Sequence, residues 1–403
     1  MVIASGFFVW LISWGLHGSF GVFYKPLLDE FGWNRGDAVF AYSLVAIVQA
    51  FLAIVMGVLT DRLGPRVVVT VFGSCLGISY ILISRIDALW QFQAFYAMSA
   101  IGLSTATIPI MATISRWFIK RRRLMTGMVQ TGAGFGGFIF APTAGWLILN
   151  YGWRPAYFIL GVVALGGIII SGLIIKRDPR DVGQFPDGER DEITQASRGK
   201  NTGVQVEGFS LSRAMRTRQF WLAAGVYFSF GFCRSTYLPH IAAHVQDLGF
   251  SLTDGARVVA ILTVSSVFGR LGMGWLNSRS AFMLSYAMTA LSLVWVLMTS
   301  DLWGVYLFAV VFGFAWGAQA VLRFTVVAET FGLVSVGLIM GALGFAEASA
   351  SAFGSYFAGF MFDLTGGYQA AFIAGIVFSV TGVILTSLLR PMVAGGGPHP
   401  SSV

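Results

Sequence analysis

The sequence predicts an all-α polytopic membrane protein in which twelve transmembrane helices form two six-helix bundles. Of its 403 residues, 56% are hydrophobic and only 11% are charged, whereas soluble domains carry about 25% charged residues. Apolar runs of about 20 residues, the length that crosses a bilayer, recur along the whole chain. One long polar stretch, residues 176–218, separates six such runs from six more.

The apolar runs place the predicted spans. The first six centre near His17, Val48, Gly77, Gly102, Gly136 and Ala164, and the last six near Phe230, Val267, Leu291, Phe312, Ala348 and Val380. We therefore expect one bundle over residues 1–175, a cytoplasmic linker over 176–218, a second bundle over 219–390 and a cytoplasmic tail over 391–403. The first run, residues 3–23, has no basic segment before it and no clear cleavage site, so we expect a retained span rather than a signal peptide.

Basic residues mark one side of the predicted bundles. They gather in the linker and in short loops at Arg62, Arg66, residues 120–123, Arg279 and Arg390. Because loops rich in Lys and Arg stay in the cytoplasm, we expect both termini to be cytoplasmic. The formal net charge of +8 follows from this topology, so we expect no nucleic-acid partner.

Motifs of soluble enzymes and of metal sites do not stand out in the sequence. There is no GxxxxGK[ST] phosphate loop, and Cys75 and Cys233 both lie inside apolar runs. The glycines at 132, 134 and 136 have no βαβ context, and close helix packing in a membrane explains them better. We expect no cofactor, no metal ion and no enzymatic activity.

The two halves of the sequence repeat one another weakly. Residues 144–158 align without gaps to residues 358–372, and GVLTDR at 57–62 is echoed by GWLNSR at 274–279. Two homologous bundles explain this repeat. In membrane proteins built from such repeats, a substrate binds between the halves near the bilayer midplane.

The stretch GVLTDRLGPR, residues 57–66, resembles the loop signature of the major facilitator superfamily between its second and third helices. The resemblance implies the fold of that superfamily and a cytoplasmic latch between the halves to which Asp61 and Arg62 contribute. The second copy departs from the pattern, because Ser278 stands where the acid is expected.

A narrower resemblance covers nearly the whole chain. GSFGVFYKPLLDEFGWNR at 18–35, SRWF at 115–118 and YGWR at 151–154 are similar to the bacterial monocarboxylate and oxalate-formate transporter branch. HIAAHVQDLGFS at 240–251 is similar to the end of helix 7 in proton-coupled lactate-type carriers. The resemblance implies a bacterial inner membrane protein. It also implies a coupling and substrate set of His240, Asp247 and Arg270, with Lys25 at the outer end of helix 1 receiving substrate.

The chemistry of these residue types agrees with that role. Arg270 lies inside an apolar run, where a charge costs a few kcal/mol and is expected to face a polar cavity or a partner. A guanidinium binds a carboxylate bidentately and stays charged. Asp247 is the predicted proton acceptor, whose protonation frees Arg270 for the anion, and His240 shares that proton. The alternatives are a structural Arg270, an exposed loop acid at Asp247 and interfacial histidines without a role.

Further polar residues lie within the predicted spans. We expect Arg234 to face the cavity with Arg270, which would favour substrates with two anionic groups. Arg323 either lines the cavity or extends to the cytoplasmic interface. Glu347 pairs with an arginine or carries a proton, and it argues against simple oxalate exchange, because the oxalate branch has a lysine in that helix. Additional candidates for lining the substrate are His17, Tyr237, Gln319 and Trp316.

The sequence thus predicts a secondary active transporter that moves a small organic carboxylate together with a proton by alternating access. One alternative is a proton-independent organic-anion exchanger. Another is a substrate-sensing receptor built on a transporter fold. The expected partners are the carboxylate, the proton and the lipid bilayer, and we expect a monomer.

Overall fold

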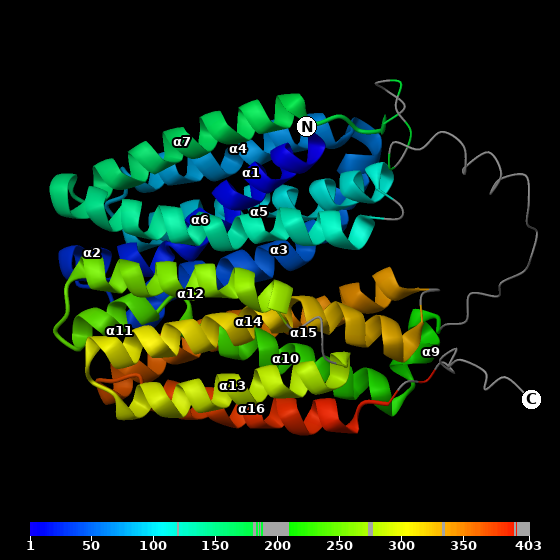
Figure 1. Ribbon diagram of the computed structural model, residues 1–403. Helices are drawn as coiled ribbons and strands as arrows, with labels where there is room; N and C mark the ends of the chain where they lie inside the picture. Colours follow the sequence, from blue (N-terminus) through cyan, green and yellow to red (C-terminus); the bar gives the residue numbers. More distant parts are fainter. Residues whose placement is uncertain are drawn as a thin grey trace, which may run out of the picture.

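The computed structural model describes residues 1–118, 121–179, 183, 185, 187, 209–272, 277–332, 335–390 and 392. Its helices form two bundles that lie side by side (Figure 1), which confirms the predicted all-α membrane fold. The first bundle contains α1 (Val2–Gly18), α2 (Phe20–Phe31), α3 (Arg35–Leu63), α4 (Pro65–Ile83), α5 (Leu89–Trp117), α6 (Arg122–Tyr151) and α7 (Trp153–Ile174). The second contains α10 (Arg218–Tyr237), α11 (Ile241–Asp247), α12 (Leu252–Gly272), α13 (Ser278–Met298), α14 (Leu302–Phe331), α15 (Val336–Thr365) and α16 (Gln369–Leu388).

The long helices of the described chain correspond to twelve crossings of the membrane. Within the described chain, eleven helices are long and apolar enough to cross a membrane, and one of them is the joined pair α1 and α2, Val2–Phe31. The remaining pass is α10, whose 20 residues include Arg218, Gln219 and Arg234 and are therefore less apolar. The end of the molecule that carries α2 and α11 is named the outer end here, because the loop charges predict that it faces away from the cytoplasm (Figure 1).

The two halves approach closely at the outer end. The chain breaks between the end of α10 at Tyr237 and the start of α11 at Ile241. Pro239 lies in this break and has no backbone N–H to donate. Gly21 of α2 packs against this break, and a Cβ atom at Gly21 would lie 2.8 Å from the Pro239 carbonyl oxygen. Only glycine therefore lets α2 and the start of α11 come so near.

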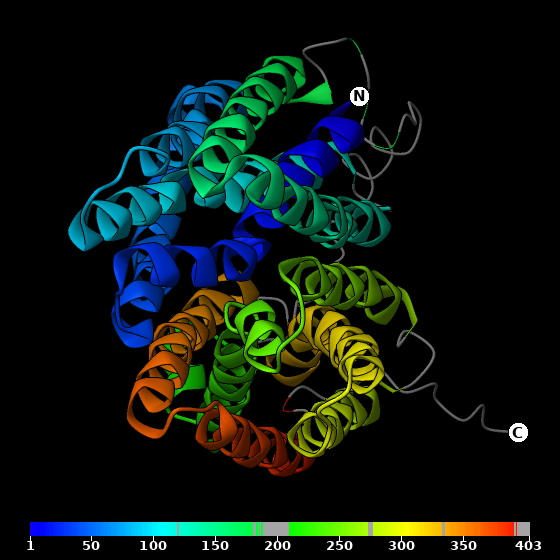
Figure 2. The same cartoon turned by 90° about the vertical axis from the view of Figure 1, so that its left-hand side faces the viewer.

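Two helix pairs join the halves along their length, α3 with α15 and α6 with α12. The end-on view shows the two groups of helices meeting along one face (Figure 2). A Cβ atom at Gly137 of α6 would lie 2.5 Å from Cγ2 of Thr263 in α12. Gly136 packs instead against the Leu11 carbonyl of α1, which agrees with the helix-packing interpretation of these glycines.

The predicted linker and tail fall largely outside the described residues. The described part of the linker contains α9 (Leu211–Met215), a short helix whose first turn is capped where Arg213 N–H donates to the Ser210 hydroxyl. Lys120 of the basic loop, residues 273–276 of the internal repeat, and residues 391 and 393–403 of the tail lie outside the description. The predicted bundle boundaries at 175 and 219 stay predictions.

The contact between α6 and α12 generates a stability prediction. Gly137→Val places two methyl groups where Thr263 already lies, and overpacking of this kind costs about 1–3 kcal/mol. We expect a lower thermal unfolding midpoint for the purified variant in detergent. The matched control is Gly166→Val, because a Cβ atom at Gly166 of α7 meets nothing within 4 Å. Equal midpoints for the two variants would contradict the close packing of α6 on α12.

Candidate functional site

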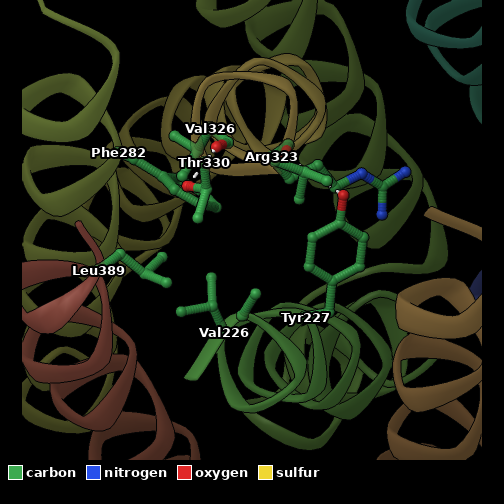
Figure 3. Close-up of a pocket in the computed structure, with 9 residues that line it drawn as sticks. Val226, Tyr227, Phe282, Arg323, Val326, Thr330 and Leu389 are labelled. Atoms are coloured by element: carbon green, nitrogen blue, oxygen red, sulfur yellow. Dashed lines mark hydrogen bonds between the residues drawn. The ribbon is translucent and has the colours of Figure 1, made fainter. Parts of the chain in front are cut away.

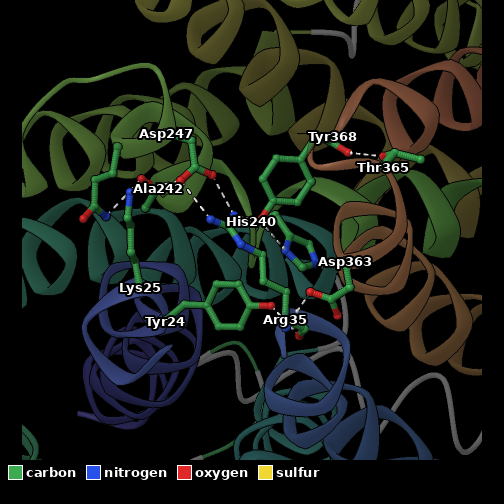
Figure 4. A network of polar contacts seen from close by, with 11 residues as sticks. Tyr24, Lys25, Arg35, His240, Ala242, Asp247, Asp363, Thr365 and Tyr368 are labelled. Atoms are coloured by element: carbon green, nitrogen blue, oxygen red, sulfur yellow. Dashed lines mark hydrogen bonds and ion pairs between the residues drawn. The ribbon is translucent and has the colours of Figure 1, made fainter. Parts of the chain in front are cut away.

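A network of charged and polar side chains closes the outer end, and we name it the outer clasp: Lys25, Arg35, Asp247, Asp363 and Tyr368 (Figure 4). The Asp247 carboxylate accepts two hydrogen bonds from the Arg35 guanidinium, at 2.7 and 2.8 Å. The Lys25 ammonium donates a third at 3.0 Å. Because Lys25 and Arg35 belong to the first half and Asp247 to the second, these ion pairs tie the halves together.

Arg35 extends the clasp to α15 and α16. Its guanidinium donates to the Tyr368 hydroxyl at 2.6 Å and lies 3.6 Å from the ring centroid of Phe362. The Tyr368 hydroxyl is 3.2 Å from Nδ1 of His240, and Nε2 of His240 is 3.0 Å from the Ser355 carbonyl oxygen. The Ser355 carbonyl can only accept, so Nε2 of His240 carries a proton. In the neutral imidazole, Nδ1 then accepts a hydrogen bond from the Tyr368 hydroxyl. Both His240 nitrogens are thereby used, and neither bonds Asp247.

Asp363 adds a backbone contact to the same closure. Its carboxylate accepts hydrogen bonds from the backbone N–H groups of Arg35, at 2.9 Å, and Gly36, at 2.7 Å. These are among the donors at the start of α3 that no helical carbonyl can satisfy. Asn34, the residue before α3, makes no side-chain cap. An acid of the second half therefore caps a helix of the first half.

The clasp changes the proton affinity of Asp247. Burial acts to raise the pKa of this carboxyl, but the hydrogen bonds and charges of Arg35 and Lys25 outweigh burial and hold its pKa below the usual range. A group whose pKa is lowered by its partners stabilises their contact above its ordinary pKa, and this stabilisation is lost as the pH falls through the lowered value. The outer clasp therefore weakens only when the pH falls below the ordinary pKa range of a carboxyl group.

Arg270 lies far from this network, so the predicted pair of Asp247 with Arg270 is wrong for this conformation. From Leu252 to Arg270, α12 covers about 27 Å at the usual helical rise. The Arg270 guanidinium donates to the Gln130 carbonyl of α6, in the other half, and lies 5.9 Å from the Trp316 ring centroid. The partners of Asp247 are Lys25 and Arg35 instead.

The sequence analysis missed Arg35, Asp363 and Tyr368. Arg35 is the last residue of the stretch 18–35, the most specific part of the family resemblance, and this position was the available signal. Asp363 and Tyr368 flank a turn after α15 and carry no comparable sequence signal.

Arg323 and Glu347 form an ion pair between α14 and α15. Their side chains are only 16% and 17% exposed, and the guanidinium lies 4.6 Å from the Phe230 ring centroid. Of the predicted alternatives, the structure therefore shows pairing for both residues rather than an Arg323 extended to the interface. A small pocket beside Arg323, lined also by Tyr227, Phe282 and Leu389, leaves room for about one water molecule and is too small for an organic acid (Figure 3).

Arg234 has no acidic partner within the described chain. Its guanidinium reaches only the Ser351 hydroxyl, at 3.4 Å, and it lies within electrostatic reach of His17 and Tyr42. His17 is buried, stacks on Tyr42 with ring centroids 4.5 Å apart, and meets the Tyr96 hydroxyl at 3.2 Å. Arg234 of the second half is therefore near enough to His17 and Tyr42 of the first half to interact with them electrostatically.

Tyr237 and Gln319 lie within the second bundle. Tyr237 donates to the Phe372 carbonyl at 3.2 Å, and Gln319 donates to the Thr289 hydroxyl at 3.0 Å. Both side chains are almost fully buried. The structure does not bring them to the contact between the halves, so their predicted contact with substrate gains no support from these positions.

Several buried donors near the arginines have no hydrogen-bond acceptor. We name the following residues the donor set: Trp10, Trp14, Tyr42, Arg234, Arg270 and Trp316, which have a buried indole N–H, phenol O–H or guanidinium Nε–H without a partner in the described chain. Trp10 and Trp14 lie on the same face of α1 as His17, because residues four and seven apart share a helix face. Buried donors are rarely left unpaired, so these groups are able to donate hydrogen bonds to an acceptor that reaches them.

Among the described residues, the predicted inner latch acid Asp61 has its polar contacts within its own half. The Asp61 carboxylate pairs with Arg116 at 3.1 Å and is 72% exposed, and Arg177 donates to the Asp61 carbonyl at 2.9 Å. Arg62 is exposed. The latch role of Asp61 and Arg62 stays a prediction.

Two helical bundles tied together at one end, with two arginines that have no acidic partner in the described chain, are an architecture found in membrane transporters. The chain belongs to the Major Facilitator Superfamily, whose family model matches residues 3–355. Rat (Rattus norvegicus) monocarboxylate transporter 13 is 26% identical over 96% of this chain and 88% of that protein. Mouse (Mus musculus) monocarboxylate transporter 11 is 28% identical over 95% of this chain and 85% of that protein.

The fold is also found among solved structures. A bacterial homologue of the human lysosomal transporter Spinster, in an inward-facing and occupied conformation, superposes with a TM-score of 0.76 at 15% identity and covers 96% of both chains. The family relatives are transporters, and this chain is a transporter rather than an enzyme.

The outer clasp generates a prediction about access from outside. Arg35→Gln removes the bidentate partner of Asp247, a partly buried ion pair between the halves that contributes more than the about 0–1 kcal/mol of a fully exposed pair. In a background without Cys75 and Cys233, a cysteine replaces Ser43, which is buried where α3 meets α15. We expect a membrane-impermeant thiol reagent added outside to label this cysteine at least about tenfold faster in the Arg35→Gln variant.

The control for this experiment is Arg257→Gln. Arg257 lies near the same end, is 63% exposed and pairs only with Asp254 three residues before it, and such surface pairs contribute about 0–1 kcal/mol. Unchanged labelling after Arg35→Gln, or an equal increase in the control, would contradict the closure assigned to the clasp.

Proposed function

We propose that this transporter moves a small organic carboxylate together with a proton by alternating access. The observation that carries the proposal is the donor set, which contains buried N–H and O–H groups without acceptors and two arginines without an acidic partner in the described chain. A carboxylate supplies several acceptor positions and one negative charge, which is what such groups require. The names of the relatives, monocarboxylate transporters, support the same substrate class.

The anion is bound by Arg270 and Arg234. Arg270 now donates to the neutral carbonyl of Gln130. A substrate carboxylate is a stronger acceptor, because charge-assisted hydrogen bonds are roughly twice as strong as neutral ones. Binding therefore exchanges a neutral contact between the halves for a charged contact with substrate.

Asp247 is the proposed proton acceptor. The cations that it releases on protonation are Lys25 and Arg35, and not Arg270 as the sequence predicted. The deprotonated carboxylate occupies both cations. When the clasp opens, the carboxyl group loses the partners that lower its pKa and can take up a proton. Protonation then keeps Lys25 and Arg35 available to an arriving carboxylate at the outer end. His240 contributes through Tyr368, which connects it to Arg35. Once the substrate has moved on to Arg234 and Arg270, Asp247 gives up its proton and pairs again with Lys25 and Arg35, so the clasp is closed before substrate and proton leave on the inner side.

Glu347 is a second candidate for the proton. Its carboxylate is held by Arg323 in a largely buried position. Protonation of Glu347 would free Arg323 in the same way that protonation of Asp247 frees Lys25.

The remaining assignments belong to the same proposal. Asp61 and Arg62 act in a latch at the inner end when the outer end is open. The protein lies in a bacterial inner membrane with both termini in the cytoplasm and acts as a monomer. The basic loops that predict this orientation support it.

Uptake into proteoliposomes tests the coupling. Asp247→Asn keeps the shape of the side chain but has no charge and does not titrate. We expect uptake driven by an inward proton gradient to fall at least about tenfold, while counterflow at equal pH on both sides is retained. The control is Asp254→Asn, an acid near the same end that pairs with exposed Arg257.

Each other result selects a different function. Full proton-driven uptake by the Asp247→Asn variant would remove Asp247 from the mechanism, and the same assay on Glu347→Gln would then test the second candidate. Flux that requires an internal counter-anion and ignores pH would replace symport by anion exchange. Carboxylate binding without any flux would indicate a sensor.

A further inference from the structure

The charges within the membrane-embedded part of the described chain do not balance. Three arginines, Arg234, Arg270 and Arg323, lie in the membrane-embedded part of the described chain, and the acid that accompanies them there is Glu347. The Glu347 carboxylate is taken by Arg323. Arg234 and Arg270 are then left with neutral acceptors, the Ser351 hydroxyl and the Gln130 carbonyl.

Two uncompensated charges set a requirement on the occupant. An unpaired buried ion costs several kcal/mol, and this cost is recovered only when a counter-charge with good geometry is supplied. A monoanion compensates one of the two arginines and leaves the other with a neutral partner. Two negative charges compensate both.

The two arginines lie at different depths. Arg234 lies three residues from the outer end of α10 at Tyr237, whereas Arg270 lies 18 residues inward from Leu252, the outer end of α12, so Arg270 is the deeper of the two. One carboxylate has its two oxygens too close together to bond both guanidinium groups at this offset. Two carboxylates separated by a carbon body can reach both.

The donor set suits such a body. Trp14 lies edge-on to His17 with ring centroids 5.7 Å apart, and its ring centroid is 5.9 Å from that of Trp10, while Trp316 lies 5.9 Å from the Arg270 guanidinium. Each indole offers an apolar face for carbon atoms and an unpartnered N–H for a carboxylate oxygen.

We propose that the transported acid is a dicarboxylate, with one carboxylate on Arg234, the other on Arg270 and its carbon body between the tryptophans. This inference rests on the proposed function, carboxylate transport, and narrows its substrate class. Arg234 is then a specificity residue that distinguishes di-acids from mono-acids, whereas Arg270 is needed for both. Arg323, already compensated by Glu347, does not contact the substrate.

The test compares glutarate with pentanoate, which has the same carbon chain and one carboxylate. Labelled uptake and counterflow into proteoliposomes give kcat/KM for the wild type and for Arg234→Gln, Arg234→Lys and Arg270→Gln, with Arg257→Gln as the exposed control. We expect the wild type to prefer glutarate at least about tenfold. Arg234→Gln removes this preference by lowering glutarate uptake alone, Arg234→Lys retains part of it, and Arg270→Gln lowers the uptake of both acids.

A binding measurement keeps the proposal falsifiable if a variant is inactive. Titration of tryptophan fluorescence with each acid reports occupancy near Trp10, Trp14 and Trp316 without flux, and glutarate should bind the wild type more tightly than pentanoate does. Equal use of the two acids by the wild type, or an equal loss of both in Arg234→Gln, overturns the dicarboxylate assignment and leaves carboxylate transport standing. Uptake of neither acid and binding of neither overturns both proposals.

Discussion

The rule that a charge buried in hydrocarbon needs a partner governs this structure. Where the chain supplies the partner, the charge fastens helices: Glu347 holds Arg323 between α14 and α15, and Asp247 holds Lys25 and Arg35 across the outer end. Where the described chain supplies no acid, at Arg234 and Arg270, the proposed function takes the counter-charge from the substrate. The same physical requirement thus builds both the closed end of the molecule and its proposed substrate site.

Alternating access can be described as an exchange of partners. In this conformation the described polar contacts between the halves concentrate at the outer end, where Asp247 and Asp363 bind the first half. Asp61 and Arg116, near the opposite end, pair within one half. A transporter that opens outward has to break the first set and form contacts at the other end. The energies of the ion pairs and hydrogen bonds at the two ends must therefore be similar, or one conformation would dominate.

The fold could be predicted from the sequence because the bilayer imposes a length and an apolar composition on every span. The exception to this apolar composition is α10, which is recognised as a span by its position more than by its hydropathy. Its polar residues include Arg234. Arg270 and Arg234 could be found for the same reason, because a charge inside an apolar run is conspicuous. The partners could not be found in this way. Asp247 and Arg270 are 23 positions apart in the sequence, but a straight helix separates them in depth, and Arg35 lies at a helix start where a charge is unremarkable.

The cap that Asp363 provides to α3 links the secondary structure of one half to the position of the other. The first amides of α3, at Arg35 and Gly36, have their acceptors only while α15 lies against them. When the halves separate at this end, these amides lose their bonds and the first turn of α3 becomes free to fray. Protection of two backbone amides against hydrogen exchange then reports which way the transporter faces, with no label and no substituted residue.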